Sequence, residues 1–300
     1  MNRRTVIRSA AGALLGAPML NLGRFRLFGP RAPEYSARCL KLMQEAVVVD
    51  MLSPLTISGQ WQKWATAPET FDETLFQKYR GSGINVFHHS FGSGGPNAYD
   101  QAIGYFGAVN ALIAGADQYF MRVDSAGDFR RVKSSGKVAI LPGLQNSEHF
   151  RRPADIPFFF GLGQRVSQLT YNARNLIGNG STERHDEGVS DFGAAIIEQM
   201  NKTGMAVDVS HCGDRTTLDA FELSKQPVLI THSNCRALAG GHPRCKTDEA
   251  IQAVGKAGGV MGITGVRMFV KNAEPTTIED ALDHFDHVRR LIGPEHLGVG

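Results

Sequence analysis

Residues 206–233 (AVDVSHCGDRTTLDAFELSKQPVLITHS) decide the fold that we expect for this chain. They contain two short apolar runs, 206–211 and 228–233, separated by one segment of helical length. Because a strand, a helix and a second strand in this order form a βαβ unit, the two runs are predicted to be neighbouring parallel strands. His211 and His232 then emerge at the carboxyl ends of their strands, where α/β enzymes place their chemistry.

These two histidines are candidate metal ligands. A neutral imidazole is the commonest metal ligand in proteins, and two of them at adjacent strand ends can reach one ion. The spacing fits equally well two unrelated histidines that hydrogen-bond to loops. The residues alone therefore leave a metal site and a purely structural role open.

Apolar runs rich in β-branched residues recur along the whole chain. Besides the two already quoted, they lie at 46–51, 84–90, 138–146, 165–172, 259–265 and 296–300. Helical patterns fill most of the gaps, including 98–121, 124–134, 191–202 and 280–292. Eight strands alternating with helices predict an α/β fold, a (β/α)8 barrel of the TIM type, with a doubly wound open sheet as the structural alternative. No GxGxxG motif follows the first run, which disfavours a dinucleotide-binding fold.

Sequence signals also mark the start of two helices and the end of the chain. Ser190 is placed to cap the helix at 191–202, and Thr276 with Glu279 has the spacing of a capping box. The eighth apolar run reaches Gly300, the last residue. We expect either that the native chain continues past this point or that the barrel closes incompletely.

The composition describes one globular chain of enzyme size. Its 300 residues are 42% hydrophobic and 20% charged, which is enough for one large core or two modest domains. A formal charge of +3, without a stripe of Lys and Arg, predicts no nucleic-acid partner. Four cysteines without a CxxC motif argue against a thiolate zinc site. Their disulfide pairing stays undecided, with Cys235 and Cys245 the nearest pair in sequence.

The N-terminus resembles an export signal of the twin-arginine type. Arg3 and Arg4 precede a mildly apolar, small-residue run at 9–20 (SAAGALLGAPML), which is too short to span a bilayer. We expect residues 1–33 to be an export signal and leader, residues 34–300 to form the barrel domain, and the protein to be exported to the periplasm. Contact with a membrane is expected only if the leader is retained as an anchor.

Polar side chains cluster in the loops predicted at the carboxyl ends of the strands. Histidines, amides and carboxylates on one rim suit a metal that activates water, and a nearby arginine suits capture of a substrate carboxylate. The candidates are Asp50, His88, His89, Gln145, Glu148, His149, Tyr171, Asn172, Glu183, Asp186, His211, His232, Arg236 and Arg244. By contrast, Asp283, His284 and His287 fall on a helix predicted outside the barrel, where we expect a packing or solvated role.

Three stretches of the chain resemble one enzyme family. Residues 188–232, which include DVSH, together with 234–248 (NCRALAGGHPRCKTD) and 283–300 (DHFDHVRRLIGPEHLGVG), look like the membrane, or renal, dipeptidase family, peptidase M19. The resemblance covers roughly residue 46 to the end. It implies a (β/α)8 barrel with a two-zinc centre that hydrolyses dipeptides. It further implies that His211 and His232 bind one zinc and that Arg244 binds the substrate carboxylate.

The chain departs from the family pattern at several site positions. Leu52 and Pro54 stand where the family has a histidine and an aspartate that ligate the other zinc. Gln145 replaces the glutamate that bridges both metals, and Tyr171 replaces a histidine that stabilises the tetrahedral intermediate. We therefore expect at most one tightly held Zn²⁺, bound by His211 and His232 with Gln145 or water completing the shell.

These observations predict a metal-dependent hydrolase that cleaves dipeptides or similar small amides by a metal-activated water. We assign catalytic roles to Tyr171 and Gln145, substrate binding to Arg244 and Asn172, and metal binding to His211 and His232. One alternative is a non-catalytic relative that binds a small carboxylate-bearing ligand. Another is a hydrolase of a lactone or modified amide that uses Tyr171 as an acid. The expected partner is a small dipeptide-like molecule, and assembly as a homodimer stays open.

Overall fold

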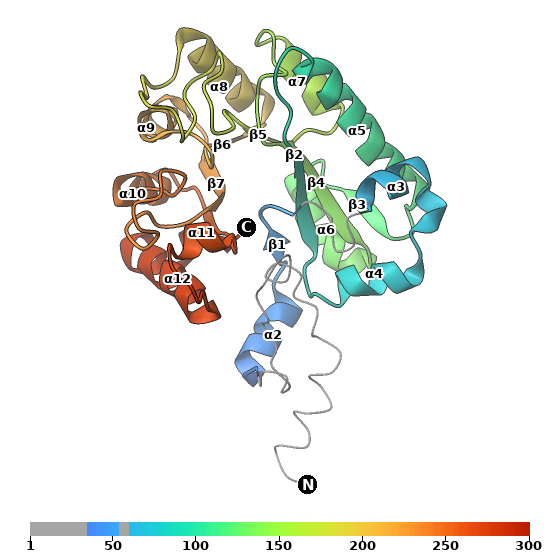
Figure 1. Cartoon of the computed structure of the whole chain (residues 1–300). Helices are drawn as coiled ribbons and strands as arrows, with labels where there is room; N and C mark the ends of the chain where they lie inside the picture. Colours follow the sequence, from blue (N-terminus) through green and yellow to red (C-terminus); the bar gives the residue numbers. More distant parts are fainter. Residues whose placement is uncertain (1–34, 54–59) are drawn as a thin grey trace.

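Eight parallel strands close into a barrel, and helices form an outer ring around it (Figure 1). The structure is a computed structural model that describes residues 35–53 and 60–300, so the predicted leader and Pro54 lie outside the described residues. In order around the barrel, the strands are β1 (Val49–Asp50), β2 (Val86–Phe91), β4 (Val138–Leu144), β5 (Val166–Gln168), β6 (Ala206–Asp208), β7 (Val228–Ser233), β8 (Met261–Ile263) and β9 (Leu297–Val299).

Closure of the barrel is complete within the described residues. The last strand, β9, pairs with both β8 and β1, and β1 in turn pairs with β2. β2 pairs with β4 along its whole length. The (β/α)8 barrel is therefore confirmed, each of the eight apolar runs holds one of its strands, and the expectations of an open sheet or of incomplete closure are wrong.

A ninth strand, β3 (Phe120–Arg122), was not predicted. The long apolar stretch that reads as one helix over 98–121 contains helix α5 (Ala98–Gly115), a short turn and then this strand. β3 pairs with the amino-terminal half of β4, whereas β5 pairs only with the last two residues of β4. The strand thus occupies the edge of β4 that β5 does not reach.

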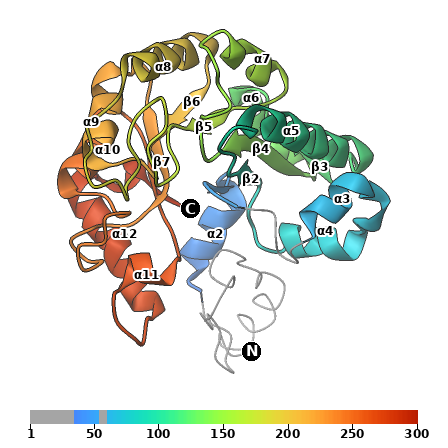
Figure 2. The ribbon, with the colours of Figure 1, turned by 45° about the horizontal axis from the view of Figure 1, so that its top comes forward.

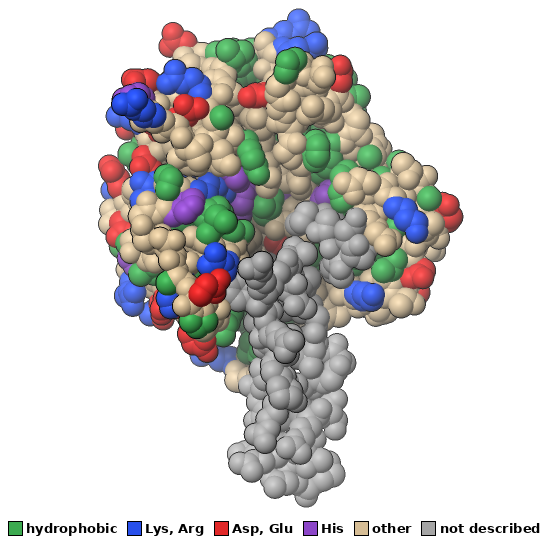
Figure 3. Space-filling view, in the orientation of Figure 1, with side chains coloured by type: hydrophobic (Ala, Val, Ile, Leu, Met, Phe, Trp, Pro, Cys, Tyr) green, Lys and Arg blue, Asp and Glu red, His purple; other side chains and the backbone are tan. Residues whose placement is uncertain are grey.

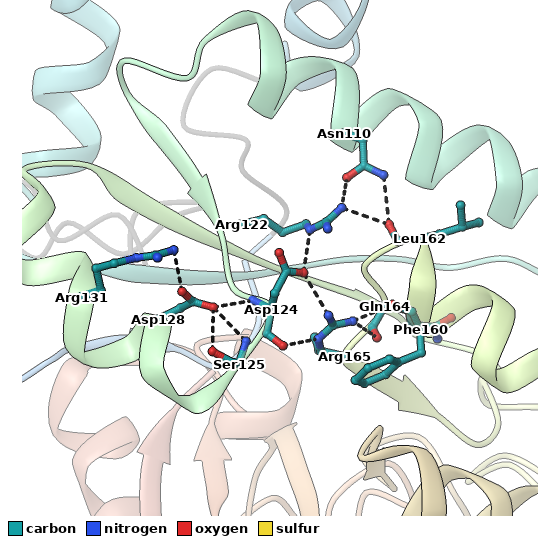
Figure 4. A network of polar contacts seen from close by, with 10 residues as sticks. All are labelled: Asn110, Arg122, Asp124, Ser125, Asp128, Arg131, Phe160, Leu162, Gln164 and Arg165. Atoms are coloured by element: carbon teal, nitrogen blue, oxygen red, sulfur yellow. Dashed lines mark hydrogen bonds and ion pairs between the residues drawn. The ribbon is translucent and has the colours of Figure 1, made fainter.

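An ion-pair network holds β3 against the start of β5 at the amino end of the barrel (Figure 4). Asp124 Oδ1 accepts from Arg122 Nε at 2.8 Å and from Arg165 Nη2 at 2.9 Å. Arg122 Nη1 also donates to Asn110 Oδ1 at 2.7 Å, which ties α5 to the same point. Because active sites of such barrels lie at the opposite, carboxyl-terminal face, we interpret this network as structural.

Most helices of the outer ring lie in two groups on either side of the strands, and the blue helix near the N-terminal end lies between these groups (Figure 2). Besides α5 they are α2 (Ala37–Glu45), α3 (Trp61–Thr66), α4 (Glu73–Arg80), α6 (Ala126–Ser135), α7 (Asp155–Gly161), α8 (Asp191–Thr203), α9 (Asp214–Leu223), α10 (Asp248–Lys256), α11 (Arg267–Val270) and α12 (Ile278–Ile292). Short 3₁₀ turns lie at Pro68–Thr70 and Pro294–His296. Among the described residues, no helix is both long and apolar enough to cross a membrane.

Helix starts follow the capping rules, with one correction. Ser190 Oγ accepts from Gly193 N at 3.0 Å, as predicted for α8. At α12 the capping box is formed by Thr277 and Asp280, not by Thr276 and Glu279. The cap therefore lies one residue later than predicted, because either of two adjacent threonines offers the same hydroxyl, and the helix begins at Ile278, two residues before the predicted start at 280.

The main core lies between the strands and the surrounding helices. From α8, Ile196, Ile197 and Met200 are fully buried against this core, together with Val207 and Val209 of the β6 segment. Since strand residues alternate between two faces, Asp208 and Ser210 then point to the barrel interior. Those two side chains are also fully buried, so the top of the barrel interior is polar.

Candidate active site

The carboxyl ends of β6 and β7 bring two histidines together. His211 follows β6, His232 lies within β7, and their Nε2 atoms are 2.9 Å apart. Their ring centroids are 4.9 Å apart, and both side chains are almost completely buried. Figure 3 shows histidine side chains beside a hollow near the middle of one face of the molecule. The pairing expected from the βαβ spacing is present.

Each ring of this pair is held by a hydrogen bond at its other nitrogen. His211 Nδ1 is 2.6 Å from Asn172 Oδ1, and His232 Nδ1 is 2.8 Å from Thr231 Oγ1. The Thr231 hydroxyl donates its proton to Asp208 Oδ2 at 2.7 Å, so its oxygen accepts from His232. Both histidines therefore carry their proton on Nδ1 and present the lone pair of Nε2.

Two lone pairs that face each other at 2.9 Å repel unless a cation lies between them. Burial is the first cause that lowers the pKa of both histidines far below 6.5, and the nearby positive charge of Arg244 lowers it further. A proton is thus a poor candidate for this cation at neutral pH. Neutral imidazoles with oriented Nε2 lone pairs are the form in which histidine binds metals.

Two buried cations lie beside the pair. Arg244 is 2% exposed, and it donates from Nη2 to His232 O at 2.8 Å and from Nη1 to Ser233 Oγ at 3.2 Å. Burial lowers its pKa to about 10, which leaves it charged. Its Nε has no hydrogen-bond partner in the described part of the chain. The structure thus fixes Arg244 against β7, and its predicted role in binding a substrate carboxylate stays a prediction.

Lys246 is the second buried cation, and the sequence reading did not single it out. Its Nζ donates to Cys212 O at 2.8 Å and to Thr217 Oγ1 at 2.9 Å, and the side chain is 1% exposed. Burial lowers its pKa to about 8. Lys246 therefore fastens the segment that follows His211 to helix α9. The only feature of the sequence that could have indicated this role is the position of Lys246, two residues after Arg244 in the same loop.

The two residues predicted to be catalytic lie at different depths of the rim. The Tyr171 ring stacks on His211 with 4.2 Å between centroids and is 42% exposed. Gln145 is half-buried at the end of β4, and its backbone N–H donates to Phe91 O at 2.8 Å. Asn172 places its side-chain oxygen on His211, and its predicted role in binding substrate stays a prediction. It has φ of 60°, a left-handed conformation that Asn tolerates better than most residues.

In the described part of the chain, no third His, Cys, Asp or Glu side chain joins the pair. Within residues 35–53 and 60–300, no group of three or more His, Cys, Asp or Glu side chains converges on one point. His88 Nδ1 lies 2.5 Å from Met51 O, and its buried Nε2 has no partner among the described residues. His89 packs edge-on against Trp61, outside the histidine pair. Neither histidine therefore replaces the ligands missing at Leu52 and Pro54.

The other candidates of the rim, and the two histidines of α12, have structural contacts. His149 is buried against Gln164 Oε1 at 3.0 Å, and Glu183 Oε1 accepts from Arg174 N at 2.7 Å. Asp186 accepts from Arg215 N at 2.8 Å and so caps α9. Four further candidates form hydrogen bonds: Arg236 donates twice to Asp214, His284 bonds to Cys235 N and Val270 O, His287 bonds to Asp248, and Glu148 accepts from Gly95 N. All four cysteines are free thiols in the described structure.

Comparison with known proteins decides the family. The family model of the membrane dipeptidases, peptidase family M19, matches residues 37–300. This chain belongs to the membrane dipeptidase family. The M19 resemblance of the stretches around His211, His232 and Arg244 is thereby confirmed.

Individual relatives agree with this placement. The chain is 35% identical over 170 residues to the dipeptidase verJ of Clonostachys rogersoniana, an alignment that covers 55% of this chain and 43% of verJ. It spans less than half the length of the curated relatives it matches. An amidohydrolase from Pseudomonas aeruginosa has the same fold with a TM-score of 0.75, 28% identity and coverage of 87% of this chain and 75% of that chain.

A second solved structure extends the comparison of the fold. A metallopeptidase from Rhodobacter sphaeroides, liganded with a phosphinate mimic of the dipeptide L-Ala-D-Ala, superposes with a TM-score of 0.69. Identity is 18%, and the match covers 85% of each chain. At this identity the comparison supports the barrel fold alone.

The membrane dipeptidase family implies a metal ion, typically zinc. The histidine pair fits such an ion, because both Nδ1 protons are committed to protein acceptors and both Nε2 lone pairs point at one place. Zinc accepts neutral imidazole nitrogen as a ligand. The donor set around this point is smaller than the family's two-zinc centre requires, since the described residues supply two histidines and no carboxylate.

Proposed function

We propose that this chain is a metal-dependent hydrolase that cleaves dipeptides or similar small amides with a metal-activated water. The observation that carries the proposal is the pair of facing Nε2 atoms, 2.9 Å apart, of His211 and His232. Membership of the membrane dipeptidase family supplies the reaction class. A bound zinc would lower the pKa of its water ligand, so that hydroxide forms near neutral pH.

Residues of the chain provide the remaining parts of this site. Asn172 and the Thr231–Asp208 pair orient the two imidazoles, a role that second-layer hydrogen bonds often have at metal sites. The fixed charge of Arg244 next to His232 favours an anionic group of the substrate at this end of the site. The exposed Tyr171 phenol, stacked on His211, is the proton donor that we assign to the leaving amine.

We infer one zinc per chain, because the half-site on β1 is replaced. Leu52 carries no ligating atom, and its backbone N–H instead donates to Asp50 Oδ1 at 3.1 Å. The amide of Gln145 can coordinate a metal but carries no charge, so it is a weak bridge between two dications. Such a site would hold its single zinc as mononuclear zinc hydrolases do, with water and Gln145 completing the coordination shell.

Metal analysis combined with an activity assay tests this proposal. Protein purified without chelators is expected to contain about one zinc per chain and to release alanine from L-Ala-L-Ala. His211→Ala and His232→Ala are each expected to lose the zinc, because one imidazole cannot hold the ion alone. His287→Ala is the matched control, since His287 lies on α12 and its hydrogen bond in the described structure is to Asp248 of α10, away from the histidine pair.

Two results would contradict the proposal at different levels. Two equivalents of zinc would refute the mononuclear site. No zinc, together with unchanged stability of His211→Ala, would refute the metal site altogether. Bound zinc without hydrolysis would favour the second candidate function, a non-catalytic relative that binds a small carboxylate-bearing ligand. The replacement of metal-binding residues by Leu52 and Gln145 supports this candidate.

We also propose that residues 1–33 direct export to the periplasm. The paired Arg3 and Arg4 ahead of the apolar run at 9–20 support this proposal. Replacement of both arginines by lysine is expected to keep the protein in the cytoplasm, as measured by cell fractionation. Unchanged export of the double variant would contradict the twin-arginine route.

A further inference from the structure

A pocket of about 410 Å³ opens on the barrel rim next to the histidine pair. Its walls come from the segment after β2, the segment after β4 and Tyr171, the third residue after β5. The lining residues are Gly92, Ser93, Gly94, Gly95, Asn146, Glu148 and Tyr171. Glu148 is the only residue of this lining with a charged side chain. Because a carboxylate attracts positive charge, this lining favours a cationic ligand group over an anionic one.

The Glu148 carboxylate is held in a defined position. Its Oε2 accepts from Gly95 N at 2.5 Å, and Gly95 adopts a φ of 73° that favours glycine. A methyl group at Gly94 would lie 3.1 Å from the same oxygen, so the loop passes directly beside the carboxylate. The other carboxylate oxygen, Oε1, makes no hydrogen bond with the described residues and is free for a ligand.

A second polar group in the same pocket is buried and unpaired. Ser93 is 4% exposed, and its Oγ has no hydrogen-bond partner among the described residues. A buried hydroxyl without a partner is costly, so it indicates a ligand group or water that completes it. Asn146 is also buried, with its Oδ1 bound to Asn175 Nδ2 at 2.9 Å. Its Nδ2 would lie 3.4 Å from a methyl group at Gly94, on the pocket side.

Tyr171 connects this pocket to the histidine pair. Its ring lines the pocket and also stacks on His211 at 4.2 Å between centroids. The loops that carry Glu148 and Gly92–Gly95 follow β4 and β2, whereas Arg244 lies in the loop after β7. In the closed barrel β4 and β2 are opposite to β7 and β8, so the carboxylate and the guanidinium flank the histidine pair from opposite sides.

We propose that Glu148 Oε1 and Ser93 Oγ form a subsite for a primary ammonium group, placed one tyrosine ring away from His211. Its occupant is the free α-ammonium of a zwitterionic ligand whose other end lies toward Arg244. A carboxylate and a hydroxyl accept N–H donors of an ammonium, and the Tyr171 ring adds a cation–π surface. The identity of the ligand as a dipeptide rests on the proposed function, whereas the preference for an ammonium group does not.

The test compares L-Ala-L-Ala with N-acetyl-L-Ala-L-Ala, which lacks the ammonium charge. We expect the wild-type protein to prefer the free amine by about tenfold or more in kcat/KM, the size of a charge-assisted hydrogen bond. Glu148→Gln keeps an acceptor for Gly95 N but removes the charge. Its ratio between the two compounds is expected to fall toward one, and Ser93→Ala is expected to lower it by a smaller factor.

Glu187→Gln is the matched control, because Glu187 is an exposed carboxylate on the same rim that lies outside this pocket. Thermal melting checks that every variant is folded. If the protein hydrolyses neither compound, the same ratio is measured as Kd by calorimetry, so that a failure of the proposed function does not hide a result for the subsite. A ratio that Glu148→Gln leaves at the wild-type value would overturn the proposal.

Discussion

The left-handed Asn172 is the residue on which the geometry of His211 depends. Its backbone oxygen accepts from Thr182 N at 3.0 Å and from Thr182 Oγ1 at 2.8 Å, which fixes its position. Its side-chain oxygen then receives the Nδ1 proton of His211 at 2.6 Å. Without this acceptor, the His211 ring can rotate or change tautomer, and its Nε2 no longer points at His232.

We expect Asn172→Ala to weaken zinc binding by about 10- to 100-fold, the usual effect of losing a second-layer partner. Asn172→Asp keeps the acceptor and tolerates the left-handed conformation, so it is expected to bind zinc at least as tightly as the wild type. Competition with a chromophoric chelator measures both affinities. Equal affinities of Asn172→Ala and the wild type would show that Asn172 does not orient His211.

At the level of elements, the amino-terminal end of helix α9 is capped by a residue that is distant in the sequence. Its N-cap residue, Gly213, has no side chain to bind the first N–H groups. Asp186 takes this role from the preceding loop, with Oδ2 2.8 Å from Arg215 N and Oδ1 2.7 Å from Thr216 Oγ1. A side chain at Gly213 would collide with this carboxylate. The helix begins three residues after His211, so its cap also steadies the histidine pair.

Asp186→Ala is expected to destabilise the protein by about 1 kcal/mol, the typical effect of a lost N-cap. It should also speed hydrogen exchange at Arg215 and Thr216, whose amides lose their acceptor. Mass spectrometry and urea unfolding measure the two effects. Glu187→Ala, at the exposed neighbour of Asp186, is the control and is expected to change neither.

Most elements followed from local patterns, whereas several contacts of the site did not. The barrel strands were predictable because each is a short apolar run between helical segments, and His211 and His232 follow from where two of those runs end. β3 was missed because its first two residues, Phe120 and Met121, continue the apolar stripe of α5. Asp186 and Lys246 act on partners about 30 residues away, and no local pattern indicates such contacts.

At the level of the whole molecule, buried neutral histidines make the fold sensitive to acid. Burial lowers the pKa of His89 and of His149 to about 4, and it also lowers the pKa of His88, His232 and His284. Below about pH 6.5 the unfolded chain takes up protons that the folded chain does not. Stability is therefore present above pH 6.5 and is lost as the pH falls toward 4.

Asp50 acts in the opposite direction. Burial raises its pKa to about 7, so between about pH 4 and 7 the folded protein holds a proton that the unfolded chain has released. Its contribution is therefore greatest at low pH and is lost as the pH rises through 7. Each such group changes the free energy of unfolding by about 1.4 kcal/mol per pH unit within its window. The histidines outnumber this aspartate, so the free energy of unfolding decreases overall when the pH is lowered.

We expect the free energy of unfolding to fall by several kcal/mol between pH 7.5 and 5.5, and to fall more steeply in Asp50→Asn, which lacks the opposing contribution. Urea unfolding at a series of pH values measures both curves. Asp117→Asn, an exposed carboxylate, serves as the control. A wild-type stability that is the same at both pH values would refute the prediction.

The seam between β1 and β9 has a consequence for the order in which the molecule assembles. The pair joins Asp50 to Val299, from opposite ends of the described chain, whereas β6 and β7 are joined through a single helix. Closing a longer loop costs more chain entropy, so contacts between near neighbours form sooner. We therefore expect the half that carries His211 and His232 to form early in folding. The pairing of β1 with β9 at Asp50 would then form last in folding and break first under mechanical force or heating.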